Sequence, residues 1–309
     1  MTGQASSTSR SLPFHLKTLW LISRSDVAPV LVPHCIAGLA NLQSGWVLGS
    51  NQPAADVTQL IIRLGCMAIW IWLNLLSLDL ANQRLDESVE EDSINKPWRP
   101  IPAGRLSQNE ARHLQMLVIP ATLGFSYFAG GLQESYVMIA LNWIYNDLGA
   151  ANENFWLRNL MNALGFMDFI VGASVVAGGP GAVLSHSGWL WVAMMGGCIF
   201  TTISLQDLYD QEGDSLRDRK TAPLVLGDLT CRVMVSVAVL GWSLATPFYL
   251  GFTLPKLAIL MLLSMTIVGR TFAFRSAASD RRTFKIWCLW IVVLYALPAL
   301  PDLPTGLIL

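Results

Sequence analysis

The stretch "GWLWVAMMGGCIFTTISLQDLYDQEGD" (residues 188–214) joins two very different kinds of sequence without a break. Its first part runs for about twenty residues without a charged side chain, which is enough for a helix to cross the hydrocarbon core of a bilayer. Its last eight positions, residues 207–214, hold three Asp and one Glu. The segment therefore predicts a membrane-spanning helix that ends in concentrated negative charge.

The composition extends this interpretation to the whole chain. Of the 309 residues, 53% are hydrophobic and only 13% are charged, and the mean hydropathy is +0.48. Soluble domains carry about 25% charged residues. We therefore expect an all-α membrane protein, with a polar N-terminal segment (1–26) and a single transmembrane domain (27–309). About nine spans are predicted, at residues 27–48, 59–81, 109–130, 132–148, 157–177, 188–206, 231–251, 255–274 and 283–301.

Lys and Arg residues predict how these spans are oriented. With nine spans and the N-terminus on one side, 18 of the 20 Lys and Arg residues fall on that side, and only Arg63 and Lys256 fall on the other. Positively charged loops face the cytosol. We therefore expect a multi-pass protein, in the endoplasmic reticulum membrane, with a cytosolic N-terminus. The lipid bilayer is an expected partner. We expect no nucleic-acid partner and infer no protein partner.

Two acidic clusters lie on this predicted cytosolic side. In "NQRLDESVEED" (residues 82–92), Asn82, Asp86 and Glu90 are spaced i, i+4, i+8. In "DLYDQEGD", the acids at positions 207, 210 and 214 follow i, i+3, i+7, and Asp218 adds a further turn if the helix continues through Gly213. Either spacing places its polar side chains on one helix face.

Carboxylates at such spacing repel one another and weaken a helix unless a cation lies between them. Mg²⁺ takes oxygen ligands, typically one or two carboxylates together with phosphate oxygens and water. The clusters are therefore interpreted as two half-sites that hold Mg²⁺ and a diphosphate. The alternative is a pair of solvated acidic loops, neutralised by the cations in "NKPWRPIPAGR" (95–105) and "RDRKTAPL" (217–224), which otherwise suit phosphate.

Together, the two acidic motifs and their basic flanks resemble the UbiA superfamily of intramembrane prenyltransferases. The resemblance implies nine helices around a central cavity, with Mg²⁺ and an isoprenoid diphosphate bound between the motifs. It assigns metal binding to Asn82, Asp86, Glu90, Asp207, Asp210 and Asp214, with Asp86, Asp210 and Asp214 the catalytic acids. The phosphate contacts that it implies are Lys96, Arg99, Arg158, Arg217 and Lys220.

Several positions depart from the family pattern. Gln83 stands where the family usually has Asp, and Glu90 where it has the third Asp. The distance from this motif to "NKPWRP" is one residue longer than in the family. Glu91 or Asp92 is therefore an alternative third acid. These departures, with "FHLKTLWLISRSD" (14–26) and "NFWLRNLMNALGF" (154–166), resemble a fungal branch of membrane-bound terpene cyclases.

This branch implies a class I reaction in which farnesyl diphosphate ionises and its own chain closes to a cyclic terpene, with release of diphosphate. The alternative is transfer of the prenyl chain to an aromatic or polyketide acceptor. Side chains expected to face the cavity are Trp143, Tyr145, Asn146, Asn162 and Phe166. A cation transporter, a third possibility, would place acids along a path near the midplane. Here the acids gather at one mouth, and the fifth, sixth and ninth predicted spans carry almost none inside, with Asp168 the exception.

Overall fold

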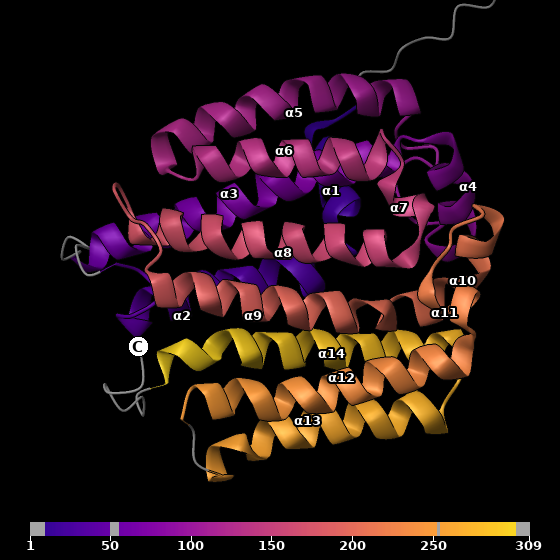
Figure 1. The fold of residues 1–309 in the computed structure, drawn as a ribbon. Coiled ribbons are helices and arrows are strands. Elements are labelled where there is room, and N and C mark those ends of the chain that lie inside the picture. Colours follow the sequence, from indigo (N-terminus) through magenta and orange to yellow (C-terminus); the bar gives the residue numbers. More distant parts are fainter. Residues whose placement is uncertain (1–9, 50–55, 252–253, 301–309) are drawn as a thin grey trace, which may run out of the picture.

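Figure 1 shows the computed structural model, which describes residues 10–49, 56–251 and 254–300. Helices make up nearly all of this part of the chain. The long ones lie side by side with their axes roughly aligned. They are α2 (Val32–Ser44), α3 (Val57–Gln83), α5 (Gln108–Ala129), α6 (Leu132–Asn146), α8 (Phe155–Gly178), α9 (His186–Thr202), α12 (Asp228–Tyr249), α13 (Leu254–Ala273) and α14 (Ala277–Ala296).

Each predicted span overlaps one of these nine helices, and α2 is extended by the preceding π-helical turn η1 (Val27–Leu31). Six helices in the described ranges are long and apolar enough to cross a membrane, within the bounds Val27–Ser44, Val57–Gln83, Phe155–Gly178, His186–Leu205, Asp228–Tyr249 and Ala277–Ala299. Over Leu257–Ala273, α13 is apolar but shorter. The all-helical membrane fold is therefore confirmed, whereas the number of nine crossings stays a prediction.

The predicted polar segment 1–26 contains a helix, α1 (Leu12–Ser23). Residues 1–9 of this segment lie outside the described part of the chain. The guanidinium of Arg105 stacks 4.1 Å from the ring centroid of Phe14. Gln83 Nε2, at the end of α3, donates to the carbonyl of Ile22. These contacts fix α1 against the end of α3 and the loop that leads to α5.

Short helices gather at one end of the bundle, as Figure 1 shows for α4 (Asp86–Asn95), α7 (Ala150–Glu153), α10 (Asp207–Leu216) and α11 (Ala222–Leu226). Helix α10 packs against α4. A Cβ atom at Gly213 would overlap the amide of Asn95, so a larger residue there would have to displace this side chain. The two acidic segments are therefore brought together at one mouth, as the sequence predicts.

Helix α3 does not continue through the first acidic segment. It ends at Gln83, and Leu85 has an extended backbone (φ −75°, ψ 141°) before α4 starts at Asp86. The predicted single face from Asn82 to Glu90 is therefore wrong. In contrast, α10 carries Asp207, Asp210 and Asp214 on one helix, but it ends before Asp218, whose φ of 51° is left-handed.

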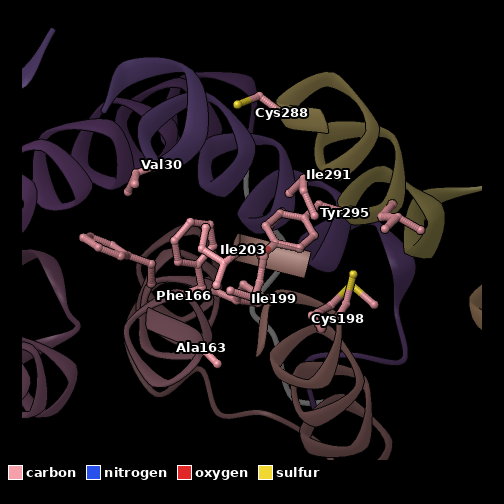
Figure 2. Packing of buried hydrophobic residues seen from close by; sticks show 14 of the residues in the cluster. Val30, Ala163, Phe166, Cys198, Ile199, Ile203, Cys288, Ile291 and Tyr295 are labelled. Carbon is pink, nitrogen blue, oxygen red and sulfur yellow. The ribbon is translucent and has the colours of Figure 1, made fainter. Parts of the chain in front are cut away.

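The apolar core lies between the long helices. Figure 2 shows Phe166 of α8 and Ile199 of α9 near Tyr295 and Ile291 of α14, with Ile203 among them. His34 of α2 is fully buried against aromatic rings, 5.1 Å from the centroid of Phe166 and 5.5 Å from that of Tyr295. Helices α2, α8, α9 and α14 thus share one packed apolar core.

Polar side chains join α3 to the α5–α6 hairpin. Asn74 Nδ2 donates to Ser135 Oγ at 3.1 Å, and Ser135 Oγ is 2.8 Å from Ser126 Oγ. Trp70 Nε1 donates to the carbonyl of Gly131 in the turn between α5 and α6. All these side chains are buried, so the hairpin contacts α3 through hydrogen bonds as well as through apolar surface.

Candidate active site

A cavity opens between α3, α6, α8 and α10, and its polar and apolar linings are separated along the helices. On α8 the lining begins at Arg158 and continues through Asn162 to Phe166 and Phe169. At 1.5 Å per residue, Arg158 and Phe169 are about 16 Å apart along the axis. The charged lining residues lie toward the end that carries α4 and α10, and they are Asp26, Asp79, Glu91, Lys96, Arg99, Arg158, Asp210 and Arg219.

The rest of the lining is either polar and uncharged (Asn82, Asn142, Tyr145, Asn162 and Gln206) or apolar. The apolar residues are Pro29, Val30, Leu75, Leu78, Met138, Leu141, Met161, Gly165, Phe166, Phe169 and Ile203, and on α3, α6 and α8 most of them lie farther from α4 and α10. On α3 and α6 the chain runs in the opposite direction, so the apolar lining residues come first in the sequence and the polar ones lie nearer α4. The cavity therefore suits a molecule with an anionic head and an apolar chain.

The second acidic motif lies at the charged mouth. Asp210 lines the cavity, and its Oδ2 is 3.8 Å from Lys96 Nζ. Asp214 is fully buried, is not among the residues that line the cavity, and accepts from Arg219 Nη1 at 3.1 Å. Within the part of the chain that is described, Asp210 Oδ1 and Asp214 Oδ2 are buried without a hydrogen-bond partner. Asp210 therefore offers an oxygen to a cation in the cavity, and Asp214 lies one helical turn behind it.

Asp207 faces a different partner. Its Oδ1 accepts from Arg158 Nη2 at 2.9 Å, and Arg158 Nη1 donates to Tyr145 Oη at 2.8 Å. Arg158 lines the cavity although Asp207 does not. Asp207, predicted as a metal ligand, therefore binds the guanidinium of Arg158, a residue that lines the cavity.

The first motif is only partly at the cavity. Asn82 lines it, whereas Asp86 and Glu90 are exposed and are not among the lining residues. Asp86 Oδ1 accepts from Gln108 Nε2 at 2.6 Å. The helix break before Asp86 explains this, because Asp86 and Glu90 no longer continue the face of α3 that carries Asn82. The structure does not bring these two predicted ligands to the site.

Both alternative third acids are buried instead. Glu91 lines the cavity and binds Arg219 Nη1 at 3.0 Å and Arg217 Nη1 at 3.2 Å. Asp92 accepts two bonds of 2.9 Å from Arg99 Nη1. Of the three candidates, only Glu91 faces the cavity.

The predicted cations divide in a similar way. Lys96, Arg99 and Arg158 line the cavity, whereas Arg217 lies behind Glu91 and Lys220 is exposed. Arg219, which the sequence analysis did not select, lines it as well. Arg219 could have been selected only from its contact with Glu91. The two residues are 128 positions apart, and no sequence pattern indicates that they meet.

Three of the five predicted cavity side chains, Tyr145, Asn162 and Phe166, line the cavity. Asn146 stands behind Asn82 and accepts from its Nδ2 at 2.8 Å. Trp143 is 56% exposed and lines a separate groove between α5 and α6, so its prediction as a cavity residue is wrong.

The acids at the mouth are influenced by burial and by one another. Burial raises the pKa of Asp210, and Asp214 and Glu91 add to this rise although Lys96 opposes it. Burial also raises the pKa of Asp207, against the effect of Arg158. Burial alone would raise the pKa of Glu91, but Arg219, Lys96 and Arg217 together lower it. A divalent cation beside Asp210 would relieve the repulsion.

The residues fit Mg²⁺ when it is shared with a phosphorylated ligand. No group of three His, Cys, Asp or Glu within the described ranges is arranged to hold a metal by itself. Mg²⁺ at phosphate sites needs only one or two carboxylates, the rest of its shell coming from phosphate and water. The unpartnered oxygen of Asp210 supplies one such ligand.

These features define a class of multi-helix membrane proteins that enclose an amphipathic cavity with a charged mouth. Within that class, the chain belongs to the UbiA prenyltransferase family, whose sequence profile matches residues 32–292. The resemblance seen in the acidic motifs is thereby confirmed.

Two relatives are terpene synthases. The chain is 27% identical to somaliensene A/B synthase of Streptomyces somaliensis over 295 residues, which is 90% of each chain. It is 29% identical to fumagillin beta-trans-bergamotene synthase of Aspergillus fumigatus over 229 residues, or 74% of this chain and 73% of that one. The predicted similarity to the terpene cyclase branch is confirmed by these matches.

The fold also resembles a solved structure, that of a UbiA homologue from Archaeoglobus fulgidus bound to GPP and Mg²⁺. The TM-score is 0.62 at 15% identity, and the match covers 92% of this chain and 100% of the other. At this identity the likeness concerns the fold.

Proposed function

We propose that the protein is a Mg²⁺-dependent class I terpene cyclase that converts farnesyl diphosphate into a cyclic terpene and diphosphate. The observation that carries the proposal is a cavity whose mouth is charged and whose depth is apolar and aromatic. An isoprenoid diphosphate has this division between head and chain. The names of the two terpene synthase relatives support cyclisation over transfer to an acceptor.

The reaction starts at the mouth. The allylic C–O bond breaks, its electron pair leaves with the diphosphate, and Lys96, Arg99 and Arg158 stabilise the growing negative charge. Asn82, Asp210 and Asp214 would hold Mg²⁺, which supplies further charge stabilisation on the leaving oxygens. Arg219 adds a fourth cation on the same side of the cavity.

The carbocation that remains lies in the apolar part of the cavity. An internal double bond of the same chain attacks the cationic carbon, and loss of a proton to diphosphate gives a new double bond. Phe166 and Phe169 line this region and Tyr145 lines the cavity nearer the mouth, and π faces of such rings stabilise a moving cation. The apolar lining keeps out water, which would otherwise trap the cation as an alcohol.

The test gives isolated membranes that contain the protein farnesyl diphosphate and Mg²⁺ without an acceptor, and gas chromatography with mass spectrometry detects the product. A cyclic hydrocarbon is expected, and Asp210→Ala should reduce it at least 100-fold. Glu212→Ala, on the exposed side of the same helix, is the matched control and should stay within about twofold of the parent. Geranyl and geranylgeranyl diphosphates are run in parallel to define chain length.

One result would replace this proposal with acceptor prenylation. It is the absence of hydrocarbon from all three substrates, together with coupling once an aromatic acid is supplied.

The protein is an integral membrane protein, as its family and its six apolar helices indicate. We propose further that it resides in the endoplasmic reticulum membrane with its charged mouth toward the cytosol. The distribution of Lys and Arg supports this orientation.

A further inference from the structure

The deep end of the cavity is formed in part by an aromatic side chain of α8. Phe169 is 2% exposed and is the residue of α8 farthest from the charged mouth among those that line the cavity. On the neighbouring helices, the lining residues farthest from the mouth are Leu75 of α3 and Met138 of α6. These three side chains belong to the floor of the cavity.

The layer beyond this floor is filled by packed side chains. Between α3 and α8, the Trp70 ring occupies the space beside Gly172, where a Cβ atom would overlap it. On α6, Ser135 is fully buried and accepts a hydrogen bond from Asn74 of α3. Trp70, Gly172 and Ser135 are not among the lining residues, so on these helices the cavity stops before this layer.

Two fully buried rings support Phe169 from behind. Its ring lies edge-on to that of Trp70, with the centroids 6.2 Å apart, and its centroid is 5.2 Å from that of His34. Trp70 Nε1 donates to the carbonyl of Gly131 at 3.1 Å, and His34 Nδ1 donates to the carbonyl of Val30 at 2.6 Å. These bonds oppose movement of either ring into space left by a smaller residue at position 169.

The depth of the cavity matches one length of isoprenoid chain. From Arg158 at the mouth to Phe169, α8 lines the cavity over about 16 Å along its axis. At about 1.2 Å for each bond, an extended farnesyl chain is about 13 Å long and an extended geranylgeranyl chain is about 18 Å long. The shorter chain therefore fits above Phe169, whereas the last isoprene unit of the longer chain would meet its ring.

We propose that Phe169, backed by Trp70 and His34, selects the farnesyl chain over the geranylgeranyl chain by closing the cavity at this depth. This inference rests on the proposed function, because it takes the ligand to be an isoprenoid diphosphate. It makes Phe169 a specificity-determining residue in addition to a wall for the carbocation. A smaller side chain should leave room for another isoprene unit, since packed surroundings relax only partly around a truncated residue.

The experiment measures the effect of chain length on binding, separately from turnover. Purified protein in lipid nanodiscs with saturating Mg²⁺ is titrated with farnesyl or geranylgeranyl thiolodiphosphate, two analogues that ionise very slowly. The midpoint of thermal unfolding is followed in each titration. In the parent protein, the concentration that gives half of the maximal stabilisation should be at least about tenfold lower for the farnesyl analogue, because even single methylene groups are discriminated to about this extent.

Truncation of the floor should reverse this preference. In Phe169→Ala, the half-stabilising concentration of the geranylgeranyl analogue should fall at least tenfold, and that of the farnesyl analogue should change less than about threefold. If Phe169→Ala does not fold, Phe169→Leu, which keeps an apolar side chain, should shift the ratio of the two concentrations at least threefold in the same direction.

The matched control removes a ring outside the cavity. Phe200 of α9 stacks on Trp156 with the centroids 5.8 Å apart, and it is not a lining residue. Phe200→Ala should therefore keep the ratio of the two half-stabilising concentrations within about twofold of the parent value.

The outcomes separate the two proposals. A folded Phe169→Ala or Phe169→Leu protein with the ratio of the parent would overturn the inference, as would a parent that binds both analogues equally well. An equal shift in Phe200→Ala would also overturn it, because looser packing would then explain the change. A parent protein that neither analogue stabilises in the presence of Mg²⁺ would instead contradict the proposed function.

Discussion

Arg158 joins three helices through two short contacts. Its guanidinium reaches Tyr145 of α6 at 2.8 Å and Asp207 of α10 at 2.9 Å, and its own side chain is only 8% exposed. A buried ion pair is maintained only when its geometry and hydrogen bonds offset the loss of hydration. The same residue lines the cavity, so one side chain contributes both to the fold and to the charge of the mouth.

Removing this cation should destabilise the protein strongly. We expect Arg158→Gln to lower the free energy of unfolding by about 3–5 kcal/mol, because Asp207 would be left buried and unpaired. Arg10→Gln breaks the exposed pair with Glu110 and should cost less than about 1 kcal/mol. Unfolding of both variants in mixed micelles measures the difference. Equal losses would show that the Arg158 pair contributes no more than a surface pair.

Among helices, the contact between α3 and α8 depends on one glycine. A Cβ atom at Gly172 would overlap the ring of Trp70, whose Nε1 is fixed by the carbonyl of Gly131. This hydrogen bond would have to break or stretch if the ring were displaced. This contact sets the spacing of two walls of the cavity.

Two alanine substitutions on α8 test this contact. Gly172→Ala should lower stability by about 1–3 kcal/mol, as overpacking does. Gly165→Ala on the same helix meets open space and should be neutral or stabilising by up to about 1 kcal/mol, since alanine favours helix. Thermal unfolding in nanodiscs compares them. A Gly172→Ala protein as stable as the parent would mean that α3 and α8 can separate without cost.

The elements show what could be predicted from the sequence. Apolar runs gave the positions of the long helices, and the i, i+3, i+7 spacing correctly placed the acids of α10 on one helix. The break at Leu85 carries no Pro or Gly, and it is accompanied by a tertiary contact from Gln83 to Ile22. The continuous helix through Asp86 was therefore a reasonable but wrong prediction.

The site could be predicted only in part, because sequence motifs do not show tertiary contacts. Asp210, Asn82 and Lys96 belong to recognisable motifs, and the structure brings them to the cavity. Asp79 was missed because it lies within an apolar run, where the sequence pattern indicates only a membrane span. Arg219 could not be distinguished from its basic neighbours without the fold.

The whole molecule is polarised from end to end. The acidic and basic residues of the mouth lie at the end with α4 and α10, whereas the turn between α8 and α9 lies at the other end. At that far end Arg63 donates to the carbonyl of Gly178. In a membrane, the two ends would face opposite compartments.

Labelling of single cysteines tests this orientation. In a variant without the five native cysteines, Ser93→Cys, at an exposed position of α4, should react with an impermeant maleimide in sealed microsomes whose cytosolic face is outside. Val183→Cys, 64% exposed in the parent and in the far turn, should react only after detergent is added. The reverse pattern would place the mouth in the lumen.

The hydrogen bonds between α3 and the α5–α6 hairpin bear on how the chain enters the bilayer. Ser126 and Ser135 would face acyl chains if the hairpin were inserted alone, and neither of its helices is among the six apolar enough by length and composition. Asn74 belongs to a helix that leaves the ribosome earlier, so the partner of Ser135 is already present when the hairpin is synthesised. Biogenesis of this hairpin is therefore expected to depend on α3, with the three helices being integrated as a group.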